Sequence, residues 1–134
     1  MTEFAFVGTH VLCDITDVAP RYIMDNDLIN DALRRGIEES GATLFEMQSR
    51  DFEPVGMTAV YLLSESHVSV HTYPECGSLF VDAFTCGTQS QPELIVATLI
   101  DALSPCKHRI TRLGRGMPVR SVARLSPARL GELT

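Results

Sequence analysis

The stretch G-M-T-A-V-Y-L-L-S-E-S-H-V-S-V-H-T-Y-P-E-C-G, residues 56–77, carries two strand patterns in succession. β-Branched and aromatic residues are enriched in Met57–Leu63, and polar and apolar residues alternate in His67–His71. If the second segment is extended, His67, Ser69 and His71 point to one face, and the two valines between them point to the other. The stretch therefore predicts a sheet with one packed face and one reactive face.

Two helices are predicted on either side of this stretch. Residues 25–41 repeat apolar side chains at helical spacing, with a cap among residues 25–27 and Gly41 as a natural stop. The segment Pro92–Leu103 opens with proline in its first turn, continues as an apolar run and ends before Pro105.

The remaining segments add strands to both ends of the pattern. The further predicted strands are Phe4–Ile15, Thr43–Gln48, Leu79–Thr85, Lys107–Leu113 and Val119–Arg124. This order indicates an α+β fold, a two-layer α/β sandwich with helices on one face of a mainly antiparallel sheet. We predict that residues 1–134 form a single domain.

Composition excludes several classes of protein. The net charge of −6 argues against a nucleic-acid partner, which would require an excess of Lys and Arg. No apolar run approaches the ~20 residues of a membrane span, and residues 1–10 lack the pattern of a signal peptide. The four cysteines form no C-x-x-C pair and are expected to be thiols. We therefore expect a cytoplasmic protein without a membrane partner.

Charge is distributed unevenly along the chain. Seven of the 11 basic residues follow residue 106, where Glu132 is the only acidic residue. One interpretation is that this basic end packs against the acidic remainder or another protomer, and the alternative is a site for an anion or a substrate carboxylate.

The reactive side chains of residues 64–77 are compatible with few known sites. A metal shared by His67 and His71 fails on reach, because four residues of a strand span ~13 Å, unless ligands come from elsewhere. There is no G-x-S-x-G elbow, P-loop or G-x-G-x-x-G motif. A pair of Cys86 with His71 is chemically feasible, and each residue taken alone also has a purely structural interpretation.

The combination of motifs resembles the prokaryotic S-adenosylmethionine decarboxylases, which are self-processing pyruvoyl enzymes. The resemblance rests on S-E-S-H at 64–67, H-T-x-P-E at 71–75 and F-T-C-G at 84–87, which occur in register with the family pattern. Fainter similarity, including G-x-H-x-L-x-D at 8–14, extends over most of the first 90 residues. Residues after Gly87 match weakly.

The resemblance implies that the chain cuts itself between Glu65 and Ser66. The products would be a β chain of residues 1–65 and an α chain of residues 66–134 that begins with a pyruvoyl group made from Ser66. By the same resemblance, His71 acts as the acid or base of processing, and Thr58 stands where a hydroxyl residue assists it.

The resemblance also implies how the substrate reacts. The pyruvoyl cofactor, without PLP or a metal, would form a Schiff base with the substrate amine, and Cys86 would return a proton to the α-carbon. Phe52 would stack on adenine and Glu75 would bind the ribose hydroxyls, with Tyr73 nearby. The chain departs from the usual family pattern near this pocket at Val55, Tyr73, Cys76 and Thr88.

These observations lead to one main functional hypothesis and two alternatives. The main hypothesis is decarboxylation of S-adenosylmethionine to S-adenosylmethioninamine and CO2 for spermidine and polyamine biosynthesis. The alternatives are the same chemistry on arginine or ornithine, and an unprocessed, non-catalytic homologue that serves as a partner subunit. We expect processed αβ protomers to form a homodimer that stacks its two sheets into a four-layer αββα arrangement.

Overall fold

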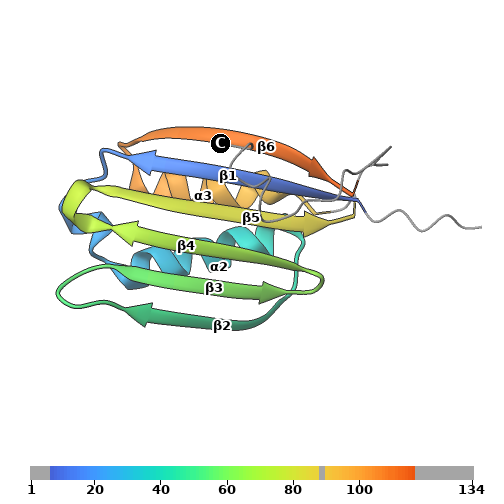
Figure 1. Cartoon of the computed structure of the whole chain (residues 1–134), viewed down its shortest axis with the longest axis horizontal. Coiled ribbons are helices and arrows are strands. Elements are labelled where there is room, and N and C mark those ends of the chain that lie inside the picture. Colours follow the sequence, from blue (N-terminus) through green and yellow to red (C-terminus); the bar gives the residue numbers. More distant parts are fainter. Residues whose placement is uncertain (1–6, 88–89, 117–134) are drawn as a thin grey trace, which may run out of the picture.

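A six-stranded sheet with helices on one face forms the body of the molecule (Figure 1). The computed structural model describes residues 7–87 and 90–116. The strand order is β2-β3-β4-β5-β1-β6, and every neighbouring pair is antiparallel. The strands are β1 (Gly8–Thr16), β2 (Leu44–Asp51), β3 (Met57–Leu63), β4 (Ser66–Tyr73), β5 (Ser78–Cys86) and β6 (Lys107–Arg115). The helices are α1 (Pro20–Ile23), α2 (Asn26–Ser40), α3 (Pro92–Leu103) and the 3₁₀ turn η1 (Pro74–Cys76). The predicted α+β sandwich is confirmed.

Local capping explains why the two long helices lie where the sequence predicts them. The Asp25 carboxylate accepts a hydrogen bond from the Leu28 N–H at 3.0 Å and so satisfies a free donor at the start of α2. Gly41 ends this helix with φ of 89°, a left-handed conformation that glycine adopts without a steric penalty. The bounds of α3 agree with the predicted Pro92–Leu103.

Most strands extend beyond the predicted bounds because pairing continues past the sequence pattern, although β2 begins at Leu44 instead of Thr43. β2 continues to Asp51, opposite Met57, although its hydrophobic pattern ends earlier. β4 and β5 each gain residues at both ends, where Tyr73 pairs with Ser78. The predicted strand at Val119–Arg124, and residues 4–6 of the first predicted strand, lie outside the described residues.

Two short elements were not predicted. α1 and η1 both begin at a proline and are too short to show a helical period.

Alternate residues of the central strands point toward α2 and α3 and form the core. The buried members on the strands include Val11, Cys13, Ile15, Met57, Ala59, Tyr61, Leu63, Val68, Val70, Leu79, Val81 and Ala83. Tyr61 reaches the helical layer, where its hydroxyl donates to the Asn30 side chain. Burial raises the pKa of the Tyr61 phenol to about 12. The tyrosine therefore stays neutral in the core.

The opposite face of the sheet, which we call the outer face, has no helix over it in the described part of the chain (Figure 1). Large apolar side chains on this face remain 38–49% exposed: Leu12, Val60, Leu62, Tyr73, Phe80 and Leu113. The outer face also carries His67, Ser69 and His71, as the alternation predicts. Directly paired residues on neighbouring strands point to the same face, and His71 pairs with the outward-pointing Phe80.

The described part of the basic end, β6, pairs with acidic residues of the body. Lys107 Nζ lies 3.3 Å from an Asp17 oxygen, and Arg109 lies 2.8 Å from the Asp14 carboxylate. Arg112 forms a third ion pair, with Glu93 of α3. For residues 107–115 this arrangement supports packing against the acidic remainder rather than a free anion site. These pairs are largely exposed, so each contributes little to stability.

The contact between α2 and α3 gives a test of the fold. A Cβ added at Gly36 would lie 2.8 Å from the Ile95 Cα, so Gly36→Ala forces the helices apart. We expect a net loss of about 1–3 kcal/mol in the free energy of unfolding, despite the better helix propensity of alanine. Urea unfolding at one fixed protein concentration would measure it. Arg35→Ala, at the neighbouring exposed position, should change stability by less than about 0.5 kcal/mol. An unchanged Gly36→Ala midpoint would contradict the close approach.

Candidate active site

The turn between β3 and β4 brings the predicted nucleophile to the end of β5. Glu65 has φ of 60°, so a residue with a side chain occupies the left-handed region directly before Ser66. The Cys86 N–H donates to the Ser66 Oγ at 3.2 Å. The Cys86 Sγ–H donates to the Glu65 carbonyl oxygen at 3.0 Å. The structure therefore brings Cys86 to Ser66, 20 residues earlier in the sequence, and to the neighbouring Glu65.

This cluster has the groups that an attack on the chain itself requires. The Ser66 hydroxyl neighbours the Glu65 carbonyl in sequence, and a thiol donor already faces the oxygen on which negative charge would develop. The left-handed backbone of Glu65 stores strain of order 1 kcal/mol, which cleavage of the following peptide bond would release.

Thr58 and His71 form a second cluster at the other end of β4. The Thr58 Oγ1 lies 2.9 Å from the His71 Nδ1, and the two residues are directly paired across β3 and β4. Five residues of strand separate His71 from Ser66, which corresponds to about 16 Å. Within one chain the structure does not bring His71 to Ser66.

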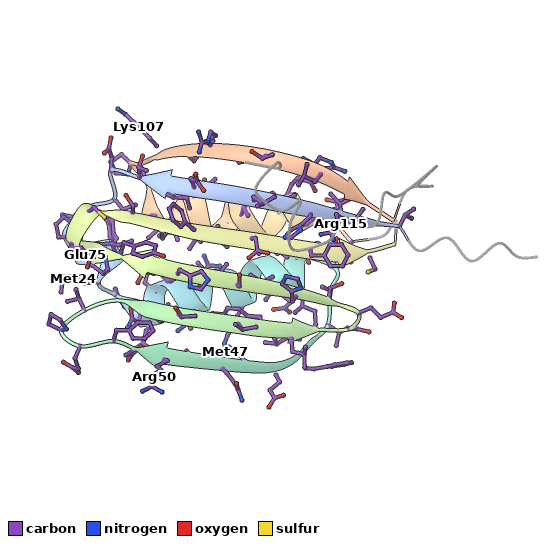
Figure 2. All side chains as sticks on the ribbon, in the orientation of Figure 1. Met24, Met47, Arg50, Glu75, Lys107 and Arg115 are labelled. Carbon is purple, nitrogen blue, oxygen red and sulfur yellow. The ribbon has the colours of Figure 1, made fainter. Side chains whose placement is uncertain are left out.

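The predicted substrate-binding residues lie at the His71 end. Phe52 is 46% exposed and lines a pocket of about 230 Å³ together with Val55 and Pro74. The Phe52 N–H donates to the Gly56 carbonyl at 2.8 Å, which closes the loop between β2 and β3. The exposed Glu75 follows Pro74 directly and lies at the opposite end of the sheet from Arg115 (Figure 2).

Tyr73 also lies near this end. Its ring packs against the Phe80 ring on the neighbouring strand, with centroids 5.3 Å apart.

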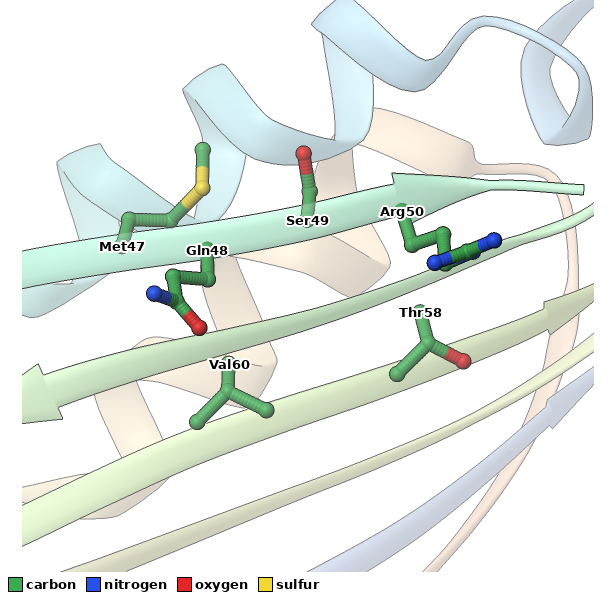
Figure 3. A pocket seen from close by; sticks show the side chains of 6 residues that line it. All are labelled: Met47, Gln48, Ser49, Arg50, Thr58 and Val60. Atoms are coloured by element: carbon green, nitrogen blue, oxygen red, sulfur yellow. The ribbon is translucent and has the colours of Figure 1, made fainter.

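A broad depression of about 640 Å³ at the β2 edge extends this region (Figure 3). Arg50 and Thr58 are directly opposite in the ladder, and the close view shows both side chains on the same side of the sheet. Arg50 adds a positive charge beside Thr58 that the sequence analysis did not single out. The pairing of β2 with β3 is what places it there.

A third cluster on the outer face was missed by the sequence analysis. Asp82 of β5 accepts hydrogen bonds from Ser69 of β4 and from the His10 Nε2, and the His67 Nε2 lies 3.3 Å from it. Burial opposes ionisation of this carboxyl, but the hydrogen bonds from Ser69 and His10 and the charge of His67 outweigh it and hold the pKa of Asp82 below its ordinary value. Arg115 extends the cluster, 3.2 Å from the His10 Nδ1. In the sequence, each of these residues occupies an outward-facing position in the alternating pattern of its own strand, but nothing there indicates that the strands are neighbours.

All four cysteines are free thiols, as predicted. Burial, with smaller effects of Asp14 and Cys106, raises the pKa of Cys13 to about 11, so this thiol is unreactive in the core. Cys86 is only partly buried and contacts the Ser66 segment. The geometry therefore singles out Cys86 as the thiol placed for chemistry.

Comparisons with known proteins agree with this arrangement. The sequence profile of the S-adenosylmethionine decarboxylase family matches residues 9–116. The chain belongs to the S-adenosylmethionine decarboxylase family. The match spans both the Ser66 and Cys86 cluster and the Thr58 and His71 pair, and so confirms the resemblance in the sequence.

Individual relatives share most of the chain. The S-adenosylmethionine decarboxylase proenzyme of Parasynechococcus marenigrum is 37% identical over 112 residues, which are 84% of this chain and 88% of the relative. The proenzyme of Brevibacillus brevis is 36% identical over 115 residues, 86% of each chain. The crystal structure of the adenosylmethionine decarboxylase from Aquifex aeolicus superposes with a TM-score of 0.72 at 28% identity, and covers 92% of this chain and 100% of that one.

The described part of the chain contains no helix long and apolar enough to cross a membrane.

Proposed function

We propose that this chain is the proenzyme of a pyruvoyl-dependent decarboxylase that converts S-adenosylmethionine to S-adenosylmethioninamine and CO2 for spermidine and polyamine biosynthesis. The observation that carries the proposal is the double contact of Cys86 with the Ser66 hydroxyl and the Glu65 carbonyl. In a member of this family, that contact places a nucleophile, an electrophile and a proton donor at one peptide bond. A working Cys86 thiol also favours a reducing compartment, so we place the reaction in the cytoplasm.

Processing begins when the Ser66 Oγ attacks the Glu65 carbonyl carbon. A C–O bond forms, the C–N bond breaks, and the released nitrogen takes a proton, which leaves an ester between the two residues. The Cys86 S–H stabilises the negative oxygen of the tetrahedral intermediate. β-Elimination then frees the Glu65 carboxylate, and water converts the dehydroalanine at position 66 to a pyruvoyl group with loss of ammonia. The products are residues 1–65 and 66–134.

The pyruvoyl group supplies a carbonyl that condenses with the substrate amine and accepts the electron pair when CO2 leaves. Cys86 holds its proton beside position 66 and is therefore placed to protonate the α-carbon. Before cleavage that proton faces the Glu65 carbonyl, so one thiol serves both stages.

A second copy of the chain completes the site. Ser66 lacks His71 within its own chain, because the two lie at opposite ends of β4. Two copies can stack outer face to outer face about a two-fold axis that is perpendicular to the strands. The β4 strands of the two copies then lie over each other and run in opposite directions. If the axis passes near the middle of β4, His71 and Thr58 of one copy meet Ser66 of the second.

The same stacking covers the apolar side chains of the outer face. The exposed Val60, Leu62 and Phe80 would become the core between two sheets, which gives the four-layer αββα arrangement. The rotation also brings Phe52 and Glu75 of one copy toward Ser66 of the other. Each active site would then use both chains.

The substrate end fits a nucleoside better than a free amino acid. The half-exposed Phe52 ring offers a stacking surface, and the exposed Glu75 carboxylate can accept hydrogen bonds from two neighbouring hydroxyls. Arginine and ornithine carry neither an aromatic base nor a ribose. The names of the relatives, which specify S-adenosylmethionine, support the same choice.

Self-cleavage tests the cofactor. We expect the intact-mass spectrum of the denatured wild-type protein to show residues 1–65 and 66–134, the second with a pyruvoyl mass, because Ser66 becomes its blocked N-terminus. Ser66→Ala should remain one chain. A single uncleaved wild-type chain would contradict processing and favour the non-catalytic partner subunit.

Coexpression tests the shared site. Ser66→Ala and His71→Ala should each stay largely uncleaved alone, because each symmetric dimer lacks one group in both sites. When the two variants are coexpressed with different tags, we expect cleavage of the His71→Ala chain only, since its Ser66 faces the intact His71 of the partner. Mass spectra of the separated tagged chains measure it. Failure of the mixture to cleave, with mixed dimers verified by pull-down, would contradict the shared site.

Kinetics test the substrate. We expect CO2 release from S-adenosylmethionine and none from arginine or ornithine. Phe52→Ala should raise KM by about tenfold or more through lost stacking, with a smaller effect on kcat. Phe52→Tyr retains the ring and should stay within about threefold of wild type. Turnover of a free amino acid without turnover of S-adenosylmethionine would establish the alternative substrate class.

A further inference from the structure

Three ligand-type side chains from three neighbouring strands converge on the outer face. The His10 Nε2 of β1 and the His67 Nε2 of β4 lie 2.7 and 3.3 Å from the same Asp82 oxygen of β5. All three atoms lie within 4.8 Å of one another. We propose that His10, His67 and Asp82 bind one divalent transition-metal ion such as Zn²⁺. His67 directly follows Ser66 in the chain, but none of the three ligands has a role in the processing steps above, so the proposal does not depend on the proposed function.

The ligand set and its spacing suit such an ion. Imidazole nitrogen and carboxylate oxygen bind Zn²⁺ at about 2.0–2.2 Å, and tetrahedral ligands of that length lie about 3.3 Å apart. The His67 to Asp82 distance already has this value, and the His10 to Asp82 distance must open by about half an ångström. The sequence alone predicts no metal, because His67 and His71 lie too far apart along one strand to share an ion. The structure keeps that pair apart and supplies His67 with partners from β1 and β5 instead.

The residues around the three ligands hold them in a binding orientation. The Ser69 hydroxyl donates to the other Asp82 oxygen, Oδ1, and leaves Oδ2 facing both histidines. A hydrogen bond from a neighbouring side chain to the other oxygen fixes the orientation of metal-ligating carboxylates in known sites. The Phe84 ring packs against both imidazoles, with centroids 5.6 Å from His10 and 5.9 Å from His67. In the single chain, side-chain exposures of 17%, 43% and 22% for His10, His67 and Asp82 leave a path for the ion and room for a water ligand. The dimer proposed above would enclose the bound ion between two sheets.

Arg115 competes with the ion for His10. Its guanidinium lies 3.2 Å from the His10 Nδ1 and can only donate, so it holds the imidazole with its proton on Nε2, toward Asp82. Metal binding needs the opposite tautomer, with a free lone pair on Nε2. Arg115 lies on the edge strand β6 and is exposed, so it can move away. Removing this guanidinium should therefore strengthen metal binding.

Metal titration of the full-length protein tests the site. After treatment with a chelator, we expect one Zn²⁺ per chain by calorimetry, and Co²⁺ absorption bands typical of nitrogen and oxygen ligands without thiolate charge transfer. His10→Ala and Asp82→Asn should each weaken binding at least about tenfold, and Ser69→Ala about tenfold. His108→Ala, an exposed histidine on β6, is the matched control and should leave binding unchanged.

Two further measurements decide the assignment. Arg115→Gln should bind Zn²⁺ several-fold more tightly than wild type. In wild-type protein with ¹⁵N-labelled histidine, Zn²⁺ should shift the ring nitrogens of His10 and His67 but not those of His108, a readout that needs no variant to fold. Absence of binding at about 100 µM Zn²⁺, thiolate bands with Co²⁺, or binding that survives both His10→Ala and Asp82→Asn would overturn the proposal and leave the cluster as a hydrogen-bonded network.

Discussion

The hydrogen-bonded register of β4 between β3 and β5 is the constraint on which every part of the site depends. It sets Ser66 near Cys86 at one end of the strand and His71 opposite Thr58 at the other. It also places Ser69 directly across from Asp82 between these ends. A shift by one residue would turn the reactive face of β4 into the core and separate all three clusters at once. The reactive residues and the fold are therefore specified by the same ladder.

Much of this arrangement is predictable from the sequence where the signal is local. The caps and glycine of α2 mark its ends, and the alternation in residues 67–71 identifies the reactive face. Strand neighbours are not local, since nothing in the pattern of β1 states that it pairs with β5. The approach of His10 to Asp82, 72 residues away, was therefore not predictable. The long distance between Ser66 and His71 was predictable, because residues four or five apart on one strand cannot meet. The same geometry excludes a metal shared by His67 and His71.

The outer face combines two properties that usually occur apart. It carries exposed apolar side chains such as Leu62 and Phe80, and among them it holds the ionised Asp82 with two histidines. Covering this face would remove water from both. Apolar contact would supply the affinity between two sheets, and the polar cluster, already internally hydrogen-bonded, would avoid the penalty for burying an unpaired charge.

The strand order gives the turn at Glu65 and Ser66 a consequence for assembly. Residues 1–65 contribute β1, β2 and β3, and residues 66–134 contribute β4, β5 and β6, yet β1 is inserted between β5 and β6. A cut in this turn therefore yields two interleaved fragments that cannot part without breaking the pairings of β3 with β4 and of β1 with both its neighbours. Folding before such a cut would be unimolecular, whereas refolding afterwards would be bimolecular and depend on concentration. The uncut chain would thus bring the two fragments together before they are separated.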